Sequence, residues 1–363
     1  MAKRLVFVIS DIGSGGAQQV AVRMINHMSA TGWMCSVVTF DSGCDDFFRI
    51  DDKVQCVRLG MIGNASNKIL GAFANLRRIF ALRAALKKLA PDTVVSFIAP
   101  TNCIAILASA FCAYKLVVSE RNDPSRQSFG LFWDAGRIIL YRFADIVTAN
   151  SRPAIKWLAR IVPKRKLSYL PNPIRRLDNP EFILPFSGRE KILIAIGRLH
   201  SQKNYSMLLR AFSLCVHQLP DWRLFIAGEG GLEGQLMELA KELNIDQNVE
   251  FLGRVENSYE LLGKASIFLM PSLYEGQPNA LLEAMKAKCP PIVSSDVPDI
   301  DYILNDGQCG VICNPHNEQE WAVNICSLIA DVERREKHAR NASERVVEWE
   351  LASVEQAWHQ VLS

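Results

Sequence analysis

The sequence Leu5-Val-Phe-Val-Ile-Ser10, which runs into the glycine-rich turn Gly13-Ser-Gly15-Gly16, decides the fold class. A second run, Lys191-Ile-Leu-Ile-Ala-Ile196, leads into Gly197 in the same way. Short continuous apolar runs that end in glycine are typical of buried parallel strands, which feed loops at their carboxyl ends. Each half of the chain therefore begins with a strand of this kind.

Further apolar runs alternate with helical patterns along the chain. Because parallel strands need crossover helices, this alternation predicts an α/β protein with two Rossmann-like, doubly wound domains facing a cleft. A length of 363 residues fits two domains. Two prolines stiffen the segment Leu170-Pro-Asn-Pro173, so we expect domains over 1–172 and 173–350. The other predicted strands are 35–40, 93–98, 115–119, 146–149, 223–227, 249–252, 267–270 and 291–294.

The small net charge of +3 hides an uneven distribution. Residues 1–172 carry 23 Lys and Arg against 11 Asp and Glu, a formal charge of +12, which leaves −9 for the rest. With 49% hydrophobic and 22% charged residues, the composition is that of a globular protein and excludes wholesale disorder or a polytopic membrane protein. The basic half is the one expected to meet an anionic partner.

Targeting and cysteine patterns point to the cytoplasm. The apolar run Leu5–Ile9 is too short for a signal-peptide core, and the twelve weakly polar residues 103–114 are too few to span a membrane. The ten cysteines include no CxxC pair and no zinc-site spacing. We therefore expect reduced thiols, no metal and no spanning helix.

The glycine loop after the first strand offers backbone N–H groups to an anionic ligand. Gly15 and Gly16 lie between a buried strand and a helical pattern, where a phosphate is stabilised. A dinucleotide fingerprint needs a third glycine where Gln18 stands, although Asp41 at the end of the next strand keeps an NAD-dependent oxidoreductase possible as an alternative. A plain tight turn is the third interpretation.

Two cations follow the first strand of the second half. Gly197-Arg198 and Lys203-Asn204 lie in one loop, where Arg198 offers a planar fork and Lys203 a mobile charge. Together they would neutralise a departing diphosphate. The alternative is a solvated loop with incidental charge.

A pair of glutamates surrounds a predicted helix start in Glu275-Gly276-Gln-Pro278-Asn279-Ala280-Leu-Leu-Glu283. Glu275 falls in a loop and Glu283 within the helix, with Pro278 suited to its first turn. Carboxylates suit sugar and ribose hydroxyls, and the N–H groups near Asn279 and Ala280 suit a phosphate. For Glu283 alone, a solvated helix position is the competing interpretation.

These three pieces resemble, in order and spacing, the GT-B-fold glycosyltransferases of family 4, over nearly the whole chain. The carrying motifs are E-x7-E at Glu275 and Glu283, GR-x4-KN at Gly197–Asn204, and Gly15-Gly16-Ala17. The resemblance implies a retaining enzyme that uses a nucleotide sugar, UDP-linked in our prediction, without a metal or cofactor. It implies catalytic roles for Arg198, Lys203 and Glu275, and donor binding by Gly15, Gly16, Gly197, Arg254, Gly276, Asn279, Ala280 and Glu283. It also places the terminal helix 351–363 with residues 1–172.

Two departures from the family pattern bear on the acceptor. Gln18-Gln19 stands where many relatives have Glu-Arg, and Arg121 stands where some have a histidine. A histidine's role therefore does not transfer. Glu120 and Arg121 are either acceptor or phosphate contacts, or members of an internal ion pair.

The acceptor prediction rests on the basic half, which takes the acceptor in this family. The helical pattern 68–89 contains Lys68, Arg77, Arg78, Arg83, Lys87 and Lys88. One stripe of it, Ile69-Phe73-Leu76-Phe80, suggests a surface for anionic lipid or a lipid pyrophosphate, and a later stripe, Ile79-Leu82-Leu86-Leu89, suggests core packing. The alternative is a charged helix that borders a soluble core.

The predicted function is therefore sugar transfer to a lipid-linked or polysaccharide glycan, peripherally on the inner face of the cytoplasmic membrane. Basic residues without interleaved aromatics argue against a nucleic-acid partner. A non-catalytic glycan-assembly partner remains an alternative, although all four donor residues of the two motifs are present.

Overall fold

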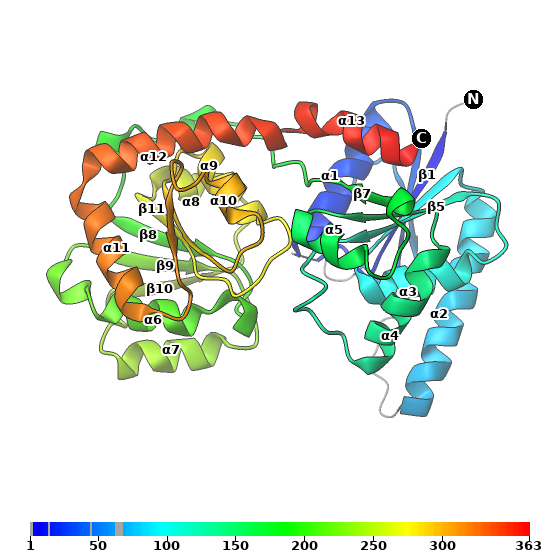
Figure 1. Cartoon of the computed structure of the whole chain (residues 1–363), viewed down its shortest axis with the longest axis horizontal. Coiled ribbons are helices and arrows are strands. Elements are labelled where there is room, and N and C mark those ends of the chain that lie inside the picture. The colour runs from blue at the N-terminus through cyan, green and yellow to red at the C-terminus, as the bar shows by residue number, and fades with distance from the viewer. Residues whose placement is uncertain (1–2, 14, 44–45, 62–67) are drawn as a thin grey trace. The chain divides into compact units, whose positions relative to one another are not determined.

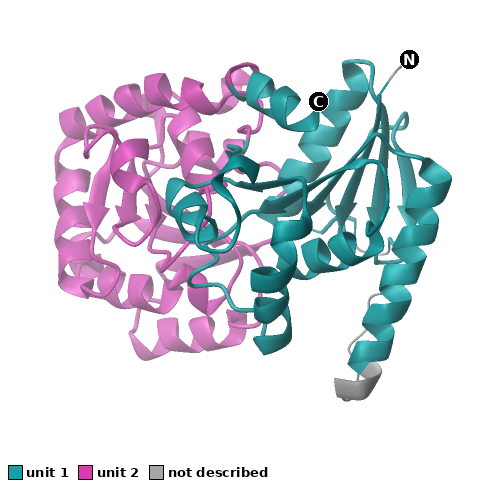
Figure 2. Ribbon diagram, turned by 45° about the vertical axis from the view of Figure 1, so that its right-hand side comes forward, with its two compact units in different colours: residues 1–172, 354–363 teal, residues 173–353 magenta. Residues whose placement is uncertain are grey.

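The computed structural model describes residues 3–13, 15–43, 46–61 and 68–363, without the side chains of 68–70. The side chains of Lys68, a basic residue of the predicted helix 68–89, and of Ile69, the first residue of its earlier apolar stripe, therefore lie outside the described part. The chain divides into two compact units, Met1–Asn172 with Val354–Ser363 and Pro173–Ser353 (Figure 2). No helix of the described part is both long and apolar enough to cross a membrane.

Unit 1 is a seven-stranded parallel sheet with strand order β3-β2-β1-β4-β5-β6-β7. Its strands are β1 Arg4–Ile9, β2 Met34–Thr39, β3 Gln55–Arg58, β4 Thr93–Phe97, β5 Lys115–Glu120, β6 Ile146–Ala149 and β7 Leu167–Tyr169. Its helices are α1 Gly16–Ala30, α2 Lys68–Leu89, α3 Ala99–Ala108, α4 Leu131–Leu140, α5 Arg152–Leu158 and α13 Leu351–Leu362 (Figure 1).

Unit 2 repeats the plan with a six-stranded parallel sheet of order β10-β9-β8-β11-β12-β13. Its strands are β8 Ile192–Ile196, β9 Arg223–Ala227, β10 Val249–Gly253, β11 Ile267–Met270, β12 Pro291–Ser294 and β13 Val311–Cys313. Its helices are α6 Tyr205–Ser213, α7 Glu233–Glu242, α8 Ser258–Lys264, α9 Asn279–Lys286, α10 Ile300–Ile303, α11 Glu318–Ala330 and α12 Val332–Arg345.

The two strands that begin each half lie at the centre of their sheets. Leu5–Ile9 of β1 and Leu193–Ala195 of β8 are almost fully buried, as continuous apolar runs predict. Chain order reverses beside each of them, between β1 and β4 in unit 1 and between β8 and β11 in unit 2. In doubly wound sheets, ligands bind beyond the carboxyl ends of the strands at this switch point. The sheets therefore direct attention to the loops after β1, β4, β8 and β11.

The predicted two-domain α/β fold is confirmed, and three short strands are additions to it. β3, β7 and β13 have three or four residues each and lie at sheet edges. β3 and β7 are partly exposed and lack the continuous apolar run that identified the central strands, and β13 is apolar but only three residues long.

The terminal helix α13 packs against unit 1 through a buried tryptophan. Trp358 stacks on Phe7 of β1 at 6.4 Å between ring centroids, and its indole Nε1 donates to the Pro171 carbonyl at 3.0 Å. The Thr93 hydroxyl donates to the Leu362 carbonyl at 3.0 Å. Unit 1 includes α13 only from Val354 onward. The first three residues of the helix, 351–353, were predicted to belong with residues 1–172 but group with unit 2.

Helix α2 shows the two faces that its sequence predicts. Leu82 and Leu86 of the later stripe are buried in the core of unit 1, with Ile79 and Leu89 packed against it. The core-packing prediction is confirmed for that stripe. Phe73, Leu76 and Phe80 of the earlier stripe are exposed.

Candidate active site

The GR-x4-KN segment forms the loop after β8, beside the switch point of unit 2. The segment Ser201–Lys203 makes a 3-10 turn, and Asn204 ends it in the left-handed conformation at φ 55°, where asparagine is tolerated better than most residues. The Asn204 side chain donates to the Pro315 carbonyl at 2.9 Å. The loop is therefore fixed at both its backbone and its last side chain.

Glycines allow this loop to pack closely. A Cβ on Gly197 would lie 2.8 Å from Lys203 Cε and 2.9 Å from the Tyr205 hydroxyl. A Cβ on Gly228, after β9, would lie 2.0 Å from the Gly197 carbonyl oxygen, an impossible contact. Gly197 therefore makes room for the lysine itself, and Gly228 makes room for the Gly197 backbone.

Lys203 meets Glu275 across the two switch-point loops. Its ammonium lies 2.5 Å from Glu275 Oε1, and the two side chains are 15% and 12% exposed. Gln202 donates to the Tyr274 carbonyl at 2.8 Å, and the Leu273 amide donates to the Gln202 carbonyl at 2.8 Å. The loops that carry Lys203 and Glu275 are thus held together by a charge pair between these residues and by hydrogen bonds between their neighbours.

Arg198 occupies the same loop but is exposed. Within the described residues its guanidinium has no hydrogen bond or ion pair. A fork of five N–H donors that no protein acceptor occupies is suited to bind an anion such as a diphosphate.

Glu283 lies on α9 and is buried, which excludes the solvated-helix interpretation. Its Oε2 accepts a 2.7 Å hydrogen bond from the Ser258 hydroxyl at the start of α8. Sequence reasoning did not identify Ser258, because a single serine at a helix start usually indicates only a cap.

Replacing Ser258 with alanine is expected to weaken nucleotide binding about three- to tenfold with little change in kcat. The variant leaves the buried Glu283 carboxylate without this hydrogen bond, and such a loss is worth about 1 kcal/mol. Calorimetric titration with UDP and steady-state kinetics would measure it. Unchanged affinity would remove Ser258 as a positioning residue.

The segment that precedes α9 carries the remaining predicted donor contacts. Gly276 and Pro278 are buried, Pro278 is the N-cap residue, and the helix begins at Asn279. The amide of Ala280 has no backbone acceptor within the described chain, as expected for a first helical turn. Arg254, directly after β10, pairs instead with Glu229 at 3.0 Å. The start of α9 therefore offers a backbone donor of the kind that suits an anion, and Arg254 is already matched by a carboxylate.

In unit 1, Asp11 organises the glycine loop after β1. Its Oδ1 accepts from the Gly13 amide at 2.9 Å and from Gln18 Nε2 at 3.1 Å. Gly15 is the N-cap of α1, and a Cβ there would lie 2.2 Å from Gln18 Oε1. Gln18 thus folds back over the loop and lies against Gly15. Sequence reasoning did not single out Asp11, although an acid directly after a buried strand is a signal for such a turn.

Two family models match the chain. Residues 14–176 match the family model "Glycosyltransferase Family 4", and residues 178–345 match "Glycosyl transferases group 1". The chain is a family 4 glycosyltransferase.

Individual relatives match over the full length. The chain is 28% identical over 363 residues, covering 99% of this chain and 98% of the other, to the GalNAc-α-(1→4)-GalNAc-α-(1→3)-diNAcBac-PP-undecaprenol α-1,4-N-acetyl-D-galactosaminyltransferase of Campylobacter jejuni. Sucrose-phosphate synthase of Thermosynechococcus elongatus shares the fold with a TM-score of 0.84 and 17% identity, over 99% of this chain and 98% of that one. Anabaena Alr3699/HepE in complex with UDP and glucose has a TM-score of 0.80 and 16% identity, over 99% of each chain.

In this glycosyltransferase the Asp41 carboxylate is occupied, which counts against dinucleotide binding. Asp41 accepts from Arg58 at 3.0 and 3.1 Å, so both its oxygens are paired. The oxidoreductase alternative, which needs this carboxylate for a ribose, is overturned by the family matches and by this pairing.

Glu120 and Arg121 are both buried, which leaves no open surface for the acceptor contacts that were predicted for them. Glu120 Oε1 lies 3.3 Å from Arg137 Nε and also accepts from the Tyr141 hydroxyl. Burial raises the pKa of Glu120, and Arg137 and Tyr141 counteract part of that increase. The internal ion pair therefore exists, but its cation is Arg137.

Arg121 holds the end of unit 1 together. Its guanidinium lies over the rings of Phe97 and Trp358, at 5.4 and 5.0 Å from their centroids. It donates to the Leu170 carbonyl at 3.0 Å and to Asn172 Oδ1 at 2.7 Å. Burial lowers its pKa to about 9. Arg121, which stands where some family members have a histidine, thus contacts both the segment that follows β7, at Leu170 and Asn172, and Trp358 of α13.

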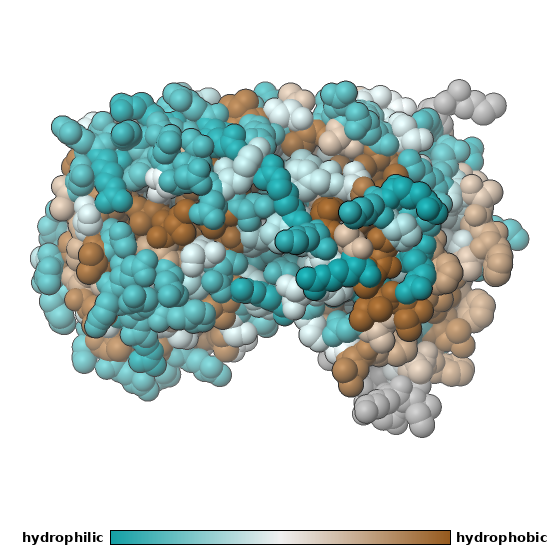
Figure 3. All heavy atoms as spheres, viewed as in Figure 1, coloured by the Kyte–Doolittle hydropathy of each residue, from teal (hydrophilic) through white to brown (hydrophobic). Residues whose placement is uncertain are grey.

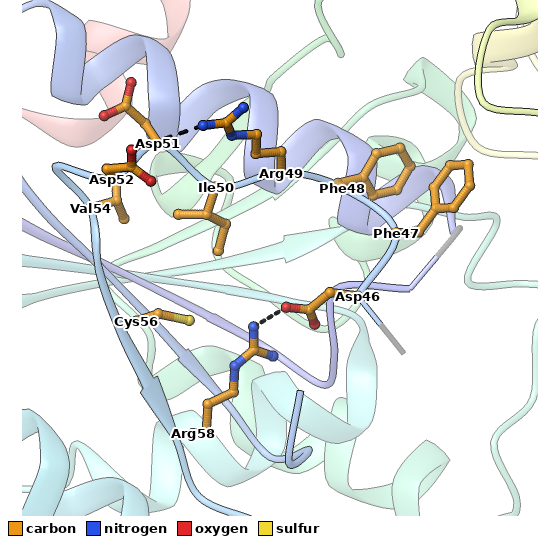
Figure 4. A pocket seen from close by; sticks show the side chains of 10 residues that line it. All are labelled: Asp46, Phe47, Phe48, Arg49, Ile50, Asp51, Asp52, Val54, Cys56 and Arg58. Atoms are coloured by element: carbon orange, nitrogen blue, oxygen red, sulfur yellow. Dashed lines mark hydrogen bonds and ion pairs between the residues drawn. The ribbon is translucent and has the colours of Figure 1, made fainter. Parts of the chain in front are cut away.

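A separate hollow of about 450 Å³ lies beside the edge strand β3 (Figure 4). It is lined by Asp46, Phe47, Phe48, Arg49, Ile50, Asp51, Asp52, Val54, Cys56 and Arg58. Arg58 points to Asp46 and Arg49 to Asp52, so its cations are paired within it. No predicted donor or acceptor residue is among those that line it.

The described residues do not support catalysis by the buried thiols of Cys103 and Cys289, or a clustered metal site. Burial raises the pKa of Cys103 and of Cys289 to about 12, so these thiols are not nucleophiles at neutral pH. Within the described residues, no three His, Cys, Asp or Glu side chains are arranged to hold a metal. Metal independence stays a prediction.

Proposed function

We propose that this glycosyltransferase moves a hexose or an N-acetylhexosamine from a UDP-linked donor to a lipid-linked glycan, with retention of anomeric configuration. The product would belong to cell-surface polysaccharide, lipopolysaccharide or glycoprotein-glycan assembly. One observation carries the proposal: Lys203 and Glu275 are fixed against each other at the switch point of unit 2, and the same loop holds Arg198, whose guanidinium has no partner among the described residues.

In this arrangement the donor's charged and polar parts each have a partner. Arg198, Lys203 and the N-terminus of α9 bind the diphosphate, Glu283 accepts from ribose hydroxyls, and Glu275 faces the sugar. Glu275 holds the Lys203 side chain in place, so little side-chain entropy remains to be lost when the donor binds. A UDP donor is supported by the structure of Anabaena Alr3699/HepE with UDP and glucose.

The reaction needs electrostatic stabilisation more than a nucleophile. The bond between sugar C1 and the diphosphate oxygen breaks as the acceptor oxygen bonds to C1 on the same face. The acceptor's proton passes to an oxygen of the departing phosphate, so the products are the extended glycan and UDP. Arg198 and Lys203 stabilise the charge that develops on the leaving group.

Support for a lipid-linked acceptor comes from unit 1 and from a relative. The Campylobacter jejuni enzyme is named for an undecaprenol diphosphate acceptor. Unit 1 contains most of the basic half of the chain, which suits an anionic lipid diphosphate and an anionic membrane surface. At its own switch point Ile98 has φ 73°, a strained conformation for a β-branched residue, and such strain concentrates at functional sites. We place the enzyme on the cytoplasmic face of the membrane, held peripherally.

The test supplies the full chain with a panel of UDP- and GDP-sugars and an undecaprenol-diphosphate-linked oligosaccharide. We expect one sugar to be added per UDP released, as measured by mass spectrometry. NMR of the product should show that the transferred sugar keeps the anomeric configuration that it has in the donor. An inverted linkage would overturn the mechanism, and failure to bind any nucleotide would revive the non-catalytic partner.

A further inference from the structure

Helix α4 of unit 1 exposes a stripe of apolar side chains. Leu131 and Phe132 are 92% and 67% exposed, and Ile138 and Ile139, two turns later, are exposed on the same stripe. The inward side carries Arg137, which is almost fully buried, together with Trp133 and Leu140, which pack against the core of unit 1. A surface helix of a globular domain normally exposes polar residues, whereas α4 is apolar on its outward side as well.

The polar interior fixes this orientation. Arg137 donates to the Pro124 carbonyl at 2.9 Å and to the Gln127 carbonyl at 3.3 Å, and it pairs with Glu120. Rolling α4 to hide its apolar stripe would leave the Glu120 carboxylate buried without a cation, which costs several kcal/mol. The exposed stripe is therefore a stable feature of the fold.

Other apolar side chains extend the surface over neighbouring elements. Phe143, in the 3-10 turn Tyr141–Phe143 after α4, is 66% exposed, and Phe111, in the turn after α3, is fully exposed. Helices α2 and α4 both pack against α3, and Phe73 and Phe80 of α2 are exposed as well. Figure 3 shows hydrophobic side chains gathered over the region where Figure 1 labels α2 and α4. Single exposed apolar residues need no explanation, but a set this large marks an interface.

Cations lie beside one end of the stripe. Lys166 donates to the Arg142 and Ala144 carbonyls at 2.9 and 2.8 Å, which brings the exposed Lys164 and Arg165 beside the end of α4. The one acid of α4, Asp134, is engaged by the Ser128 hydroxyl and the Phe129 amide. Aromatic and aliphatic side chains bordered by cations match the interface of an anionic bilayer.

We propose that the α4 surface, defined as Leu131, Phe132, Ile138, Ile139 and Phe143, inserts into the interfacial layer of an anionic phospholipid bilayer. It provides the hydrophobic part of binding, and the basic residues of unit 1 provide the electrostatic part. The proposal builds on the peripheral location stated in the proposed function, but it rests on different residues from the donor site. Because no residue of the donor site is involved, donor binding in solution is independent of it.

The test compares the full-length chain with the double variant Leu131→Ser/Phe132→Ser on sedimenting vesicles of phosphatidylcholine with phosphatidylglycerol. The wild type is expected to bind, and part of its binding is expected to survive 1 M salt because apolar burial is not screened. The double variant should lose this salt-resistant part, with a partition coefficient at least about tenfold lower. The matched control is Val323→Ser on α11 of unit 2, also 67% exposed, which should bind like the wild type.

Each other outcome would overturn the insertion proposal. A double variant that keeps the salt-resistant binding would exclude α4 as the inserting element. If light scattering showed that the wild type is a dimer and the double variant a monomer, the surface would be assigned to contact with a second copy of this chain. UDP titration of both proteins separates this failure from failure of the proposed function, because UDP binding should be equal in the two.

Discussion

Replacing Lys203 with alanine is expected to reduce sugar transfer about 10²- to 10³-fold, mostly in kcat. The ammonium is the cation positioned to balance charge on the departing diphosphate. Its loss has a second effect, because Glu275, 2.5 Å away and mostly buried, is left without its partner. The unbalanced carboxylate would then repel the diphosphate. Initial rates under saturating donor and acceptor measure this change.

The Lys203 prediction has a close control in unit 2. Lys191, directly before β8, pairs with Asp221 at 2.7 Å on the exposed surface at the opposite end of that strand. Lys191→Ala removes the same kind of side chain and should leave the rate within about twofold of wild type, because exposed pairs contribute little. Arg198→Ala, whose guanidinium has no protein partner among the described residues, should lower the rate about 10- to 100-fold without affecting the fold. A Lys203→Ala variant with the wild-type rate would refute the leaving-group assignment.

The centre of the fold was predictable because buried parallel strands are continuously apolar. The apolar runs Leu5–Ile9 and Leu193–Ala195 are shielded from solvent at the centre of a sheet. The motifs that follow them therefore fall at the switch points. The edge strands β3 and β7 were missed because their partly exposed residues carry no such pattern. β13 is mostly buried, and it was missed because three residues are too few to show one. Long, strongly biased segments predict structure, and short ones do not.

The donor site was predictable as residues but not as geometry. Spacing identified Lys203 and Glu275 as candidates, and the structure adds that they contact each other. Spacing could not show that Ser258 donates to Glu283, because that contact joins separate helices. Spacing also could not show that Glu120 pairs with Arg137, because a sequence does not distinguish a buried arginine on an apolar helix from an exposed one. Long-range pairings of polar side chains are the part that sequence patterns do not contain.

That buried pair gives the prediction with the largest effect on stability. Arg137→Met is expected to lower the free energy of unfolding by about 3–5 kcal/mol, because Glu120 stays buried without a cation. Glu120→Gln/Arg137→Met should recover most of the loss, since the amide can still accept from Tyr141. Arg142→Met, on the exposed surface one turn later, is the matched control and should be near neutral. Urea unfolding at neutral pH measures all three.

The cost of Arg137→Met should also depend on pH, with a sign set by the Glu120 carboxyl. Burial raises the pKa of Glu120 above its ordinary value of 4.5, so the folded state binds a proton more tightly than the unfolded state. The free energy of unfolding therefore falls as pH rises from that value through the folded-state pKa. Removing Arg137 takes away the charge that opposes this increase, so the variant should lose more stability at about pH 8 than at about pH 5. The Gln/Met double variant has no carboxyl at this position and should show no such difference. An equal loss for Arg137→Met at both pH values would mean that Glu120 is already neutral in the wild type, and that Arg137 stabilises unit 1 through its carbonyl hydrogen bonds alone.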